Sequence, residues 1–181
     1  MPEEWSTRPG HRRVSGIMRS MTLVFSVHGR DTLWVVADRR LSYGGLRPPI
    51  DDAVKVMCLQ TSDGVGVLGY AGLGATSKGT QPSDWMSAAL RGRGGMDFEQ
   101  SLGVLTTVAI RDLPRHLVSV PGGGHSILAP AFLRGIGPRI YSIDTVVSRE
   151  RQQLAYRFTK HECTDVPGSP PPRFAVAGVG C

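Results

Sequence analysis

The sequence predicts a protein of the α+β class, built from antiparallel strands and a smaller number of helices. Residues 22–40 contain two short strand-like runs joined by a polar turn, and residues 126–159 contain three more in succession. Between these regions, residues 83–91 and 97–105 have the composition and spacing of helices. This combination of antiparallel strands with intervening helices is the basis of the α+β prediction.

Length and composition fit one globular domain. A chain of 181 residues can bury a core of its own, and contents of 40% apolar and 20% charged residues are ordinary for a soluble protein. No apolar run approaches the roughly 18 residues that a membrane-spanning helix needs, so no membrane association is predicted. The cysteines are odd in number and widely spaced, which argues against a disulfide framework or zinc cluster and favours a cytoplasmic protein: Cys58, Cys163 and Cys181.

The net charge of +6 and pI of about 9.7 raise the question of a nucleic-acid partner. The basic residues are scattered along the chain, and they form neither a basic helix nor a basic strand with interleaved aromatic residues. A solvated basic surface is therefore the preferred interpretation, and no nucleic-acid partner is predicted.

The first two strands are expected at the start of the domain. Residues 23–28 alternate with the period of a half-buried strand, and residues 28–31 are polar with a glycine, which predicts a turn. Residues 33–37 are continuously apolar, as in a strand covered on both faces. The charged residues 38–40 follow directly. An ionisable group at the end of a buried strand is either a solvated strand end or part of a functional site.

The middle of the chain predicts further strands and two helices. Residues 52–57 return to extended structure, and the glycine-rich residues 64–72 form a strand that leads toward a helix. The first helix is expected to be capped by residues 83–84, and the second by Asp97. Residues 106–110 are rich in β-branched side chains, which weakens the helix prediction there.

The last part of the chain predicts an antiparallel sheet. Its consecutive strands are expected at residues 126–132, 139–144 and 153–159. The proline-rich residues 167–172 predict a rigid extended loop, and residues 173–181 return to a strand.

Four positions in these elements carry a resemblance to a known family. Thr22 opens the first predicted strand, Asp38 closes the second, Lys55 lies on the third extended segment, and Gly72 ends the glycine-rich strand. Thr22 precedes Asp38 by 16 residues, and Asp38 precedes Lys55 by 17. In this order and spacing the sequence resembles the proteasome β-subunit family of N-terminal nucleophile hydrolases, in which matching Thr, Asp, Lys and Gly residues form the active site.

Two later motifs extend the resemblance over residues 22–181. The segment GPRIYSID at residues 137–144 resembles the family's GPxLYxID strand, and residues 174–180 resemble its strand ending in GSG. Two positions depart from the family pattern. Val179 stands where the GSG-like motif has its Ser, and Met21 stands where self-processing members usually carry Gly before the nucleophile.

The resemblance implies a four-layer αββα sandwich of two antiparallel sheets flanked by helices. Family members continue well past the GSG-like segment, so we expect residues 22–181 to be a C-terminally truncated domain with one helical layer incomplete. Residues 1–21 are expected to be an N-terminal extension or propeptide. Alternatively, translation starts at Met21, and removal of this residue leaves Thr22 first.

The resemblance also implies roles for the matched residues. A free Thr22 would supply the nucleophilic hydroxyl, and its α-amine, with a pKa of roughly 7.7–8.0, would act as the base. Lys55 would favour the deprotonated forms of both groups, and Asp38 would orient Lys55. Gly72 would donate a backbone N–H to the oxyanion, and Arg40 would support the site.

Each of these residues also has a purely structural interpretation. Thr22 preceded by other residues is only a β-branched residue at a strand start. Asp38 and Lys55 would then form a structural ion pair worth about 0–1 kcal/mol, and Gly72 would only allow a turn. Ser20 is an alternative nucleophile if the first turn is longer than usual.

The function implied is that of a threonine-type endopeptidase that needs no cofactor. Its expected partners are a peptide or unfolded-protein substrate, other copies of the chain in a homo-oligomeric ring, and an ATPase. Two alternatives have the same fold: a non-catalytic structural subunit of a proteasome-like assembly, and a small-molecule amidase. Peptide and small-amide substrates would separate the amidase from the peptidase.

Other residue types give no competing site. No pair of histidines has the spacing of a metal site, and the glycine-rich residues 122–125 do not match a phosphate-binding loop. Cys58 lies in an apolar strand-like run and is expected in the core.

Overall fold

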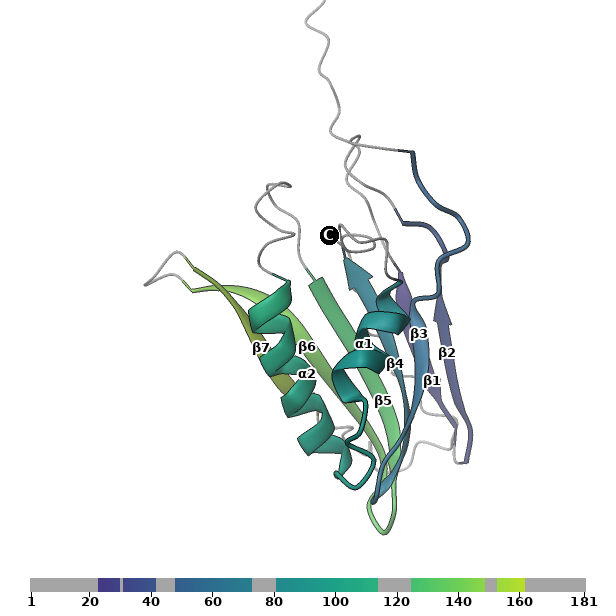
Figure 1. Ribbon diagram of the computed structural model, residues 1–181. Coiled ribbons are helices and arrows are strands. Elements are labelled where there is room, and N and C mark those ends of the chain that lie inside the picture. Colours follow the sequence, from purple (N-terminus) through teal and green to yellow (C-terminus); the bar gives the residue numbers. More distant parts are fainter. Residues whose placement is uncertain are drawn as a thin grey trace, which may run out of the picture.

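The computed structural model describes residues 23–29, 31–41, 48–72, 81–113, 125–148 and 153–161. These residues form a two-stranded and a five-stranded antiparallel sheet together with two α-helices (Figure 1). The prediction of an α+β fold is confirmed. The predicted N-terminal extension of residues 1–21 and the predicted C-terminal strand of residues 173–181 lie outside the described residues.

The small sheet is the hairpin predicted near the start of the chain. Strands β1 (Val24–His28) and β2 (Leu33–Ala37) pair antiparallel, with Val24 opposite Ala37 at the open end. The amide of Gly29 donates to the carbonyl oxygen of Thr32 at 2.7 Å and closes the turn. Alternate residues of β1 are buried, as the strand period requires.

The large sheet has the strand order β3-β4-β5-β6-β7, and each neighbouring pair is antiparallel. Four of its strands lie where the sequence predicts them, although β5, β6 and β7 are longer than expected. The bounds are β3 (Val56–Gln60), β4 (Gly64–Gly72), β5 (His125–Leu133), β6 (Gly137–Ser148) and β7 (Gln153–His161).

Strand β3 begins later than predicted, at Val56 instead of residue 52. The residues before it make contacts other than ladder pairing. Ala53 donates its amide to the carbonyl oxygen of Arg39 at 3.0 Å, and Val54 donates its amide to Oε1 of Gln81 at 3.1 Å. These hydrogen bonds hold the segment between β2 and the first helix.

Helix α1 (Pro82–Leu90) starts earlier than predicted. Its N-cap is Gln81, so the expectation that residues 83–84 cap the helix is wrong. Pro82 occupies the first helical turn, where its missing amide costs nothing. Asp84 accepts a hydrogen bond from the amide of Gln81 at 3.3 Å and so still contributes to the cap.

Helix α2 (Phe98–Asp112) has the predicted cap, since the amide of Gln100 donates to Oδ1 of Asp97 at 2.7 Å. The helix continues through its β-branched stretch to Asp112. Burial of Leu105 and Ala109 accounts for this, because packing of an apolar face outweighs a weak local propensity.

The main core lies between the helices and the large sheet. Both helices lie across one face of that sheet in Figure 1, and their buried side chains form one cluster with residues of β3 to β6. A second, smaller cluster joins the hairpin to the sheet, where Val24 packs against Ala71, Leu128 and Ile140. Because neighbouring strand residues point to opposite faces, the hairpin contacts the face that the helices leave uncovered.

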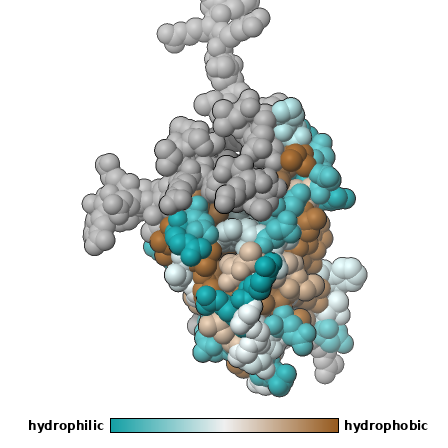
Figure 2. Space-filling view, in the orientation of Figure 1, coloured by the Kyte–Doolittle hydropathy of each residue, from teal (hydrophilic) through white to brown (hydrophobic). Residues whose placement is uncertain are grey.

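The surface of the described residues is mixed. Figure 2 shows hydrophobic and hydrophilic residues side by side on the visible face. The most exposed large apolar side chains include Leu23, Trp34 and Val36 of the hairpin region. The expectation that residues 33–37 are covered on both faces is therefore wrong, since alternate residues of β2 are exposed. None of the helices in the described part of the chain is long and apolar enough to cross a membrane.

The hairpin contains buried polar side chains without a hydrogen-bond partner among the described residues, and His28 is the titratable one. His28 is 3% exposed, its ring lies 5.9 Å from the ring of Phe132, and neither of its ring nitrogens has a hydrogen-bond partner among the described residues. Desolvation by burial lowers the pKa of His28 below its ordinary value of 6.5. The neutral imidazole is therefore the form that the fold accepts.

We expect His28 to make the protein less stable in mild acid. Its pKa is lower in the folded state, so the unfolded chain binds the proton first as pH falls below 6.5. The free energy of unfolding should therefore decrease through this range, as urea denaturation between about pH 8 and pH 5 would measure. His28→Leu removes the titrating ring without removing a partner and should flatten this dependence. Equal slopes for the two proteins would contradict the expectation.

Candidate active site

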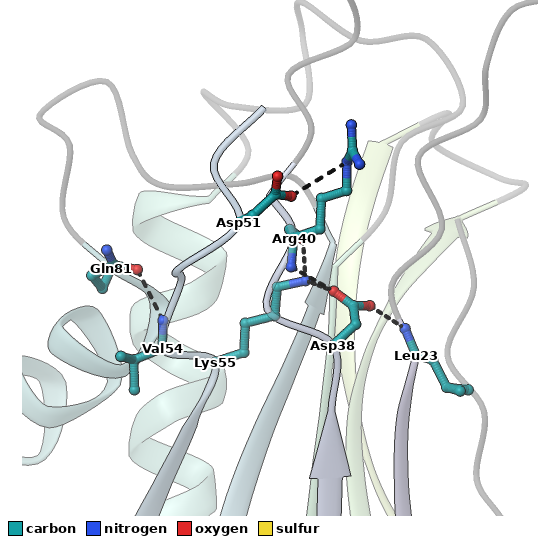
Figure 3. Close-up of polar contacts among 7 residues, drawn as sticks. All are labelled: Leu23, Asp38, Arg40, Asp51, Val54, Lys55 and Gln81. Carbon is teal, nitrogen blue, oxygen red and sulfur yellow. Dashed lines mark hydrogen bonds and ion pairs between the residues drawn. The ribbon is translucent and has the colours of Figure 1, made fainter. Parts of the chain in front are cut away.

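Lys55 lies at the centre of the candidate site. Its side chain is 1% exposed, and its Nζ donates to Oδ1 of Asp38 at 2.5 Å and to the carbonyl oxygen of Arg40 (Figure 3). An ammonium group removed from water is costly unless it is both paired and hydrogen-bonded. Among the described residues, one carboxylate and one main-chain oxygen contribute to meeting this requirement.

Asp38 receives hydrogen bonds on both carboxylate oxygens. Oδ1 accepts the Arg40 amide at 3.0 Å in addition to Lys55, and Oδ2 accepts the Leu23 amide at 2.8 Å. Desolvation raises the pKa of Asp38, but the hydrogen bond from Lys55, the amide of Leu23, the charge of Lys55 and the amide of Arg40 together outweigh it. The pKa of Asp38 is therefore lowered, and the carboxylate is ionised at neutral pH.

The hairpin positions Asp38. This residue directly follows β2, and its amide donates to the carbonyl oxygen of Leu23 at 3.1 Å, while its side chain accepts the amide of the same residue. The start of β1 is thus fixed to the end of β2 by two hydrogen bonds. The amide nitrogen of Leu23 is thereby held at the carboxylate of Asp38.

The large sheet and α1 position Lys55. The amide of Tyr70 on β4 donates to the carbonyl oxygen of Lys55 at 2.8 Å, which continues the β3–β4 pairing by one residue. Its neighbour Val54 is held on both sides, because its amide donates to Gln81 and its carbonyl oxygen accepts the amide of Ser83 at 3.2 Å. Lys55 therefore extends from a fixed backbone between β4 and α1.

Arg40 takes part through its backbone. Its carbonyl oxygen accepts Lys55, whereas its guanidinium Nε lies 3.7 Å from Oδ1 of Asp51, in a pair in which both side chains are largely exposed. Such an exposed ion pair contributes little. Arg40 and Asp51 directly flank the bridge between Leu41 and Ile50.

Gly72 is the last residue of β4, the strand whose Tyr70 amide bonds Lys55. It lies opposite His125 of β5, and its φ of 143° is in a region that favours glycine. Main-chain groups of alternate residues in a strand point to the same neighbouring strand, and Tyr70 points its amide at Lys55. By this alternation the N–H of Gly72 is directed to the Lys55 side of β4, roughly 7 Å farther along the strand.

The structure thus brings Asp38 into contact with Lys55 and places Gly72 on the adjoining strand. The proposed nucleophile Thr22, its alternative Ser20, and the two departures from the family pattern, Met21 and Val179, all lie outside the described residues.

Sequence reasoning missed the main-chain partners of the site. The amide of Leu23 and the carbonyl oxygen of Arg40 have no sequence signature, because every residue carries these groups. It also missed the contact of Tyr70 Oη with Nδ1 of His125, although an aromatic residue two positions before Gly72 gives a weak signal.

A second polar cluster lies on β5, β6 and β7. Asp144 accepts hydrogen bonds from Ser126 and, at 2.5 Å, from Ser142, whose Oγ also lies 2.8 Å from Nε2 of His161. Because one hydroxyl has a single proton, Ser142 donates to the carboxylate, and Nε2 of His161 is then the donor to Ser142. The cluster ties three strands together.

Neither a metal nor a cysteine site emerges in the parts of the chain that the structure describes. No three His, Cys, Asp or Glu side chains within them are close enough to share a metal ion. Cys58 on β3 is exposed, so the expectation that it lies in the core is wrong. It belongs to the strand at the edge of the large sheet, where alternate side chains point away from the core.

Comparison with known proteins leaves the family open, since no protein-family model, no curated protein and no solved structure matches this chain.

Proposed function

We propose that the chain is a threonine-type peptidase of the N-terminal nucleophile class, related to proteasome β subunits, with Thr22 as the nucleophile. The observation that carries this proposal is the buried Lys55 ammonium paired with Asp38, whose other oxygen accepts the amide of Leu23. One peptide bond joins Thr22 to that amide nitrogen. A chain that begins at Thr22 would therefore begin beside the Asp38–Lys55 pair.

In the proposed reaction, the hydroxyl of Thr22 attacks the carbonyl carbon of a peptide bond, and its proton passes to the α-amine of the same residue. The charge of Lys55 favours the deprotonated hydroxyl and amine, and the N–H of Gly72 stabilises the oxyanion. The C–N bond then breaks, and the α-ammonium returns the proton to the leaving amine. Water hydrolyses the resulting ester, with the α-amine again as the base.

The buried pair favours this role over a purely structural one. A lysine of this burial is costly, and replacing a buried ion pair with apolar residues is often neutral or stabilising. A fold that only needed to join β2 to β3 would gain more from apolar side chains. A chemical role that requires a fixed positive charge explains why Lys55 is held there.

The same proposal includes the four-layer αββα arrangement. It is supported by the two helices on one face of the large sheet and by the packing of Val24 on the other face. A homo-oligomeric ring, an ATPase partner, a peptide or unfolded-protein substrate and a cytoplasmic setting rest on the family resemblance alone.

A non-catalytic subunit of the same fold is the second candidate. Met21 before the nucleophile position and Val179 in the GSG-like motif favour it, because each replaces a residue that the family uses in processing or catalysis. The two candidates differ in one chemical respect. The peptidase requires a free amine on Thr22, whereas a structural subunit can keep residues 1–21.

The intact mass of the full chain, expressed in its native host, tests the proposal. A species that begins at Thr22 is expected, since the reaction needs its α-amine as the base. A mass that retains residues 1–21 would leave this nitrogen acylated and would support the non-catalytic subunit. Comparing kcat/KM for peptides and for small amides then separates the peptidase from a small-molecule amidase.

A further inference from the structure

Gly72 and His125 are the pair at one end of the β4–β5 ladder. The amide of His125 donates to Oγ1 of Thr145 at 2.8 Å, and the same hydroxyl donates to the carbonyl oxygen of His125 at 2.8 Å. Both main-chain groups of His125 are therefore directed at β6. Since the two groups of a strand residue point to the same neighbour, Gly72 and His125 form a non-hydrogen-bonded pair between β4 and β5.

Side chains join the two strands at this level. The hydroxyl of Tyr70 hydrogen-bonds Nδ1 of His125, with the ring centroids 5.6 Å apart and tilted by 44°. Tyr70 lies opposite Ile127, so this bond crosses diagonally from β4 to the next alternate residue of β5. Both side chains are 3% exposed, which makes the hydrogen bond costly to lose.

The pair occupies positions next to Gly72 on one face of the sheet. Tyr70 and Gly72 are two residues apart on β4 and share a face, and His125 lies directly opposite Gly72. Gly72 has no side chain of its own to pack, and its φ of 143° is one conformation among many that glycine adopts at little cost. A strand end of this kind would fray without a further constraint.

We infer that Tyr70 and His125 are positioning residues that fix the Gly72 peptide. Thr145 holds the backbone of His125 on β6, and the hydrogen bond from Tyr70 holds the side chain of His125 opposite Gly72, so the Gly72 N–H keeps its direction toward the Lys55 side. The structural part of this inference stands on these contacts. Its catalytic consequence rests on the proposed function, in which that N–H binds the oxyanion.

Amide hydrogen exchange tests the structural part without any need for activity. In Tyr70→Phe, exchange of the Gly72 amide should be about tenfold faster, while exchange of the Ala129 amide in the middle of β5 stays unchanged. Tyr141→Phe is the matched control, because Tyr141 is a buried tyrosine of the same sheet that donates to Glu99 at 3.0 Å. It should leave the Gly72 amide unaffected. Equal exchange at Gly72 in wild type and Tyr70→Phe, or faster exchange all along β5, would overturn the inference.

Steady-state kinetics test the catalytic part. Tyr70→Phe should lower kcat for amide hydrolysis about tenfold with KM changed by less than about twofold, since the donor is displaced and not removed. His125→Asn, whose amide can take the place of Nδ1, should keep more of kcat than His125→Leu. Unchanged kcat in Tyr70→Phe would overturn the catalytic part. A wild-type protein without hydrolytic activity would instead refute the proposed function, and hydrogen exchange would still decide the positioning role.

Discussion

Replacing Thr22 by Ala is expected to reduce amide hydrolysis by about 10⁴-fold or more, because the variant lacks the only hydroxyl that the proposed reaction uses. Thr22→Ser keeps a hydroxyl and an α-amine in the same place and should retain measurable activity. Initial rates on a peptide substrate, measured on chains whose mass shows that they begin at residue 22, provide the comparison.

The two variants also control for folding. Both replace the same residue with a smaller one, so a loss of structure should affect them alike, whereas the loss of a nucleophile affects only Thr22→Ala. Matching melting temperatures with divergent activities would support the role of Thr22. Activity in Thr22→Ala equal to that of the wild type would rule out Thr22 as the nucleophile, and Ser20 would then be the residue to replace.

Local sequence patterns predicted most of the fold. Strand β4 has the predicted bounds, because polar residues and glycines mark its ends, and the Asp97 cap identified the start of α2. The errors arose where distant residues decide the structure. The late start of β3 depends on hydrogen bonds of Ala53 to Arg39 and of Val54 to Gln81, which no local pattern encodes.

The candidate site was less accessible to sequence reasoning. Spacing alone does not place Asp38 beside Lys55, since they lie 17 positions apart in the sequence, and only the family resemblance suggested this contact. The contact of Tyr70 with His125 depends on the register between β4 and β5, and the long connection between these strands hides that register from sequence patterns.

Lys55→Met is expected to separate activity from stability. The substitution removes a buried charge and fills its place with an apolar side chain of similar length, so the free energy of unfolding should change little. Asp38 keeps the amides of Leu23 and Arg40 and is 32% exposed, so its carboxylate remains solvated. Hydrolysis should nevertheless fall about 10²–10³-fold, as expected for the loss of a major electrostatic stabilisation.

Asp38→Asn is expected, by contrast, to reduce stability. It leaves the Lys55 ammonium buried without its carboxylate, which should cost about 3–5 kcal/mol in urea denaturation at neutral pH. The wild-type pair should also lose stability in acid, because a lowered pKa gives Asp38 a contribution that is complete above its ordinary pKa of 3.8 and lost as pH falls through the folded value.

The double variant Asp38→Asn with Lys55→Met completes a double-mutant cycle with the two single variants. When Lys55 is replaced as well, the loss of the Asp38 carboxylate leaves no buried ammonium unpaired. The double variant should therefore be more stable than Asp38→Asn alone, and it should lack hydrolytic activity. A catalytic role of Lys55 explains why Lys55→Met should lose activity without losing stability, since the protein would keep this charge for its chemistry and not for its stability. Full activity in Lys55→Met would instead show that the pair serves only the fold, and the non-catalytic subunit would become the better account of this chain.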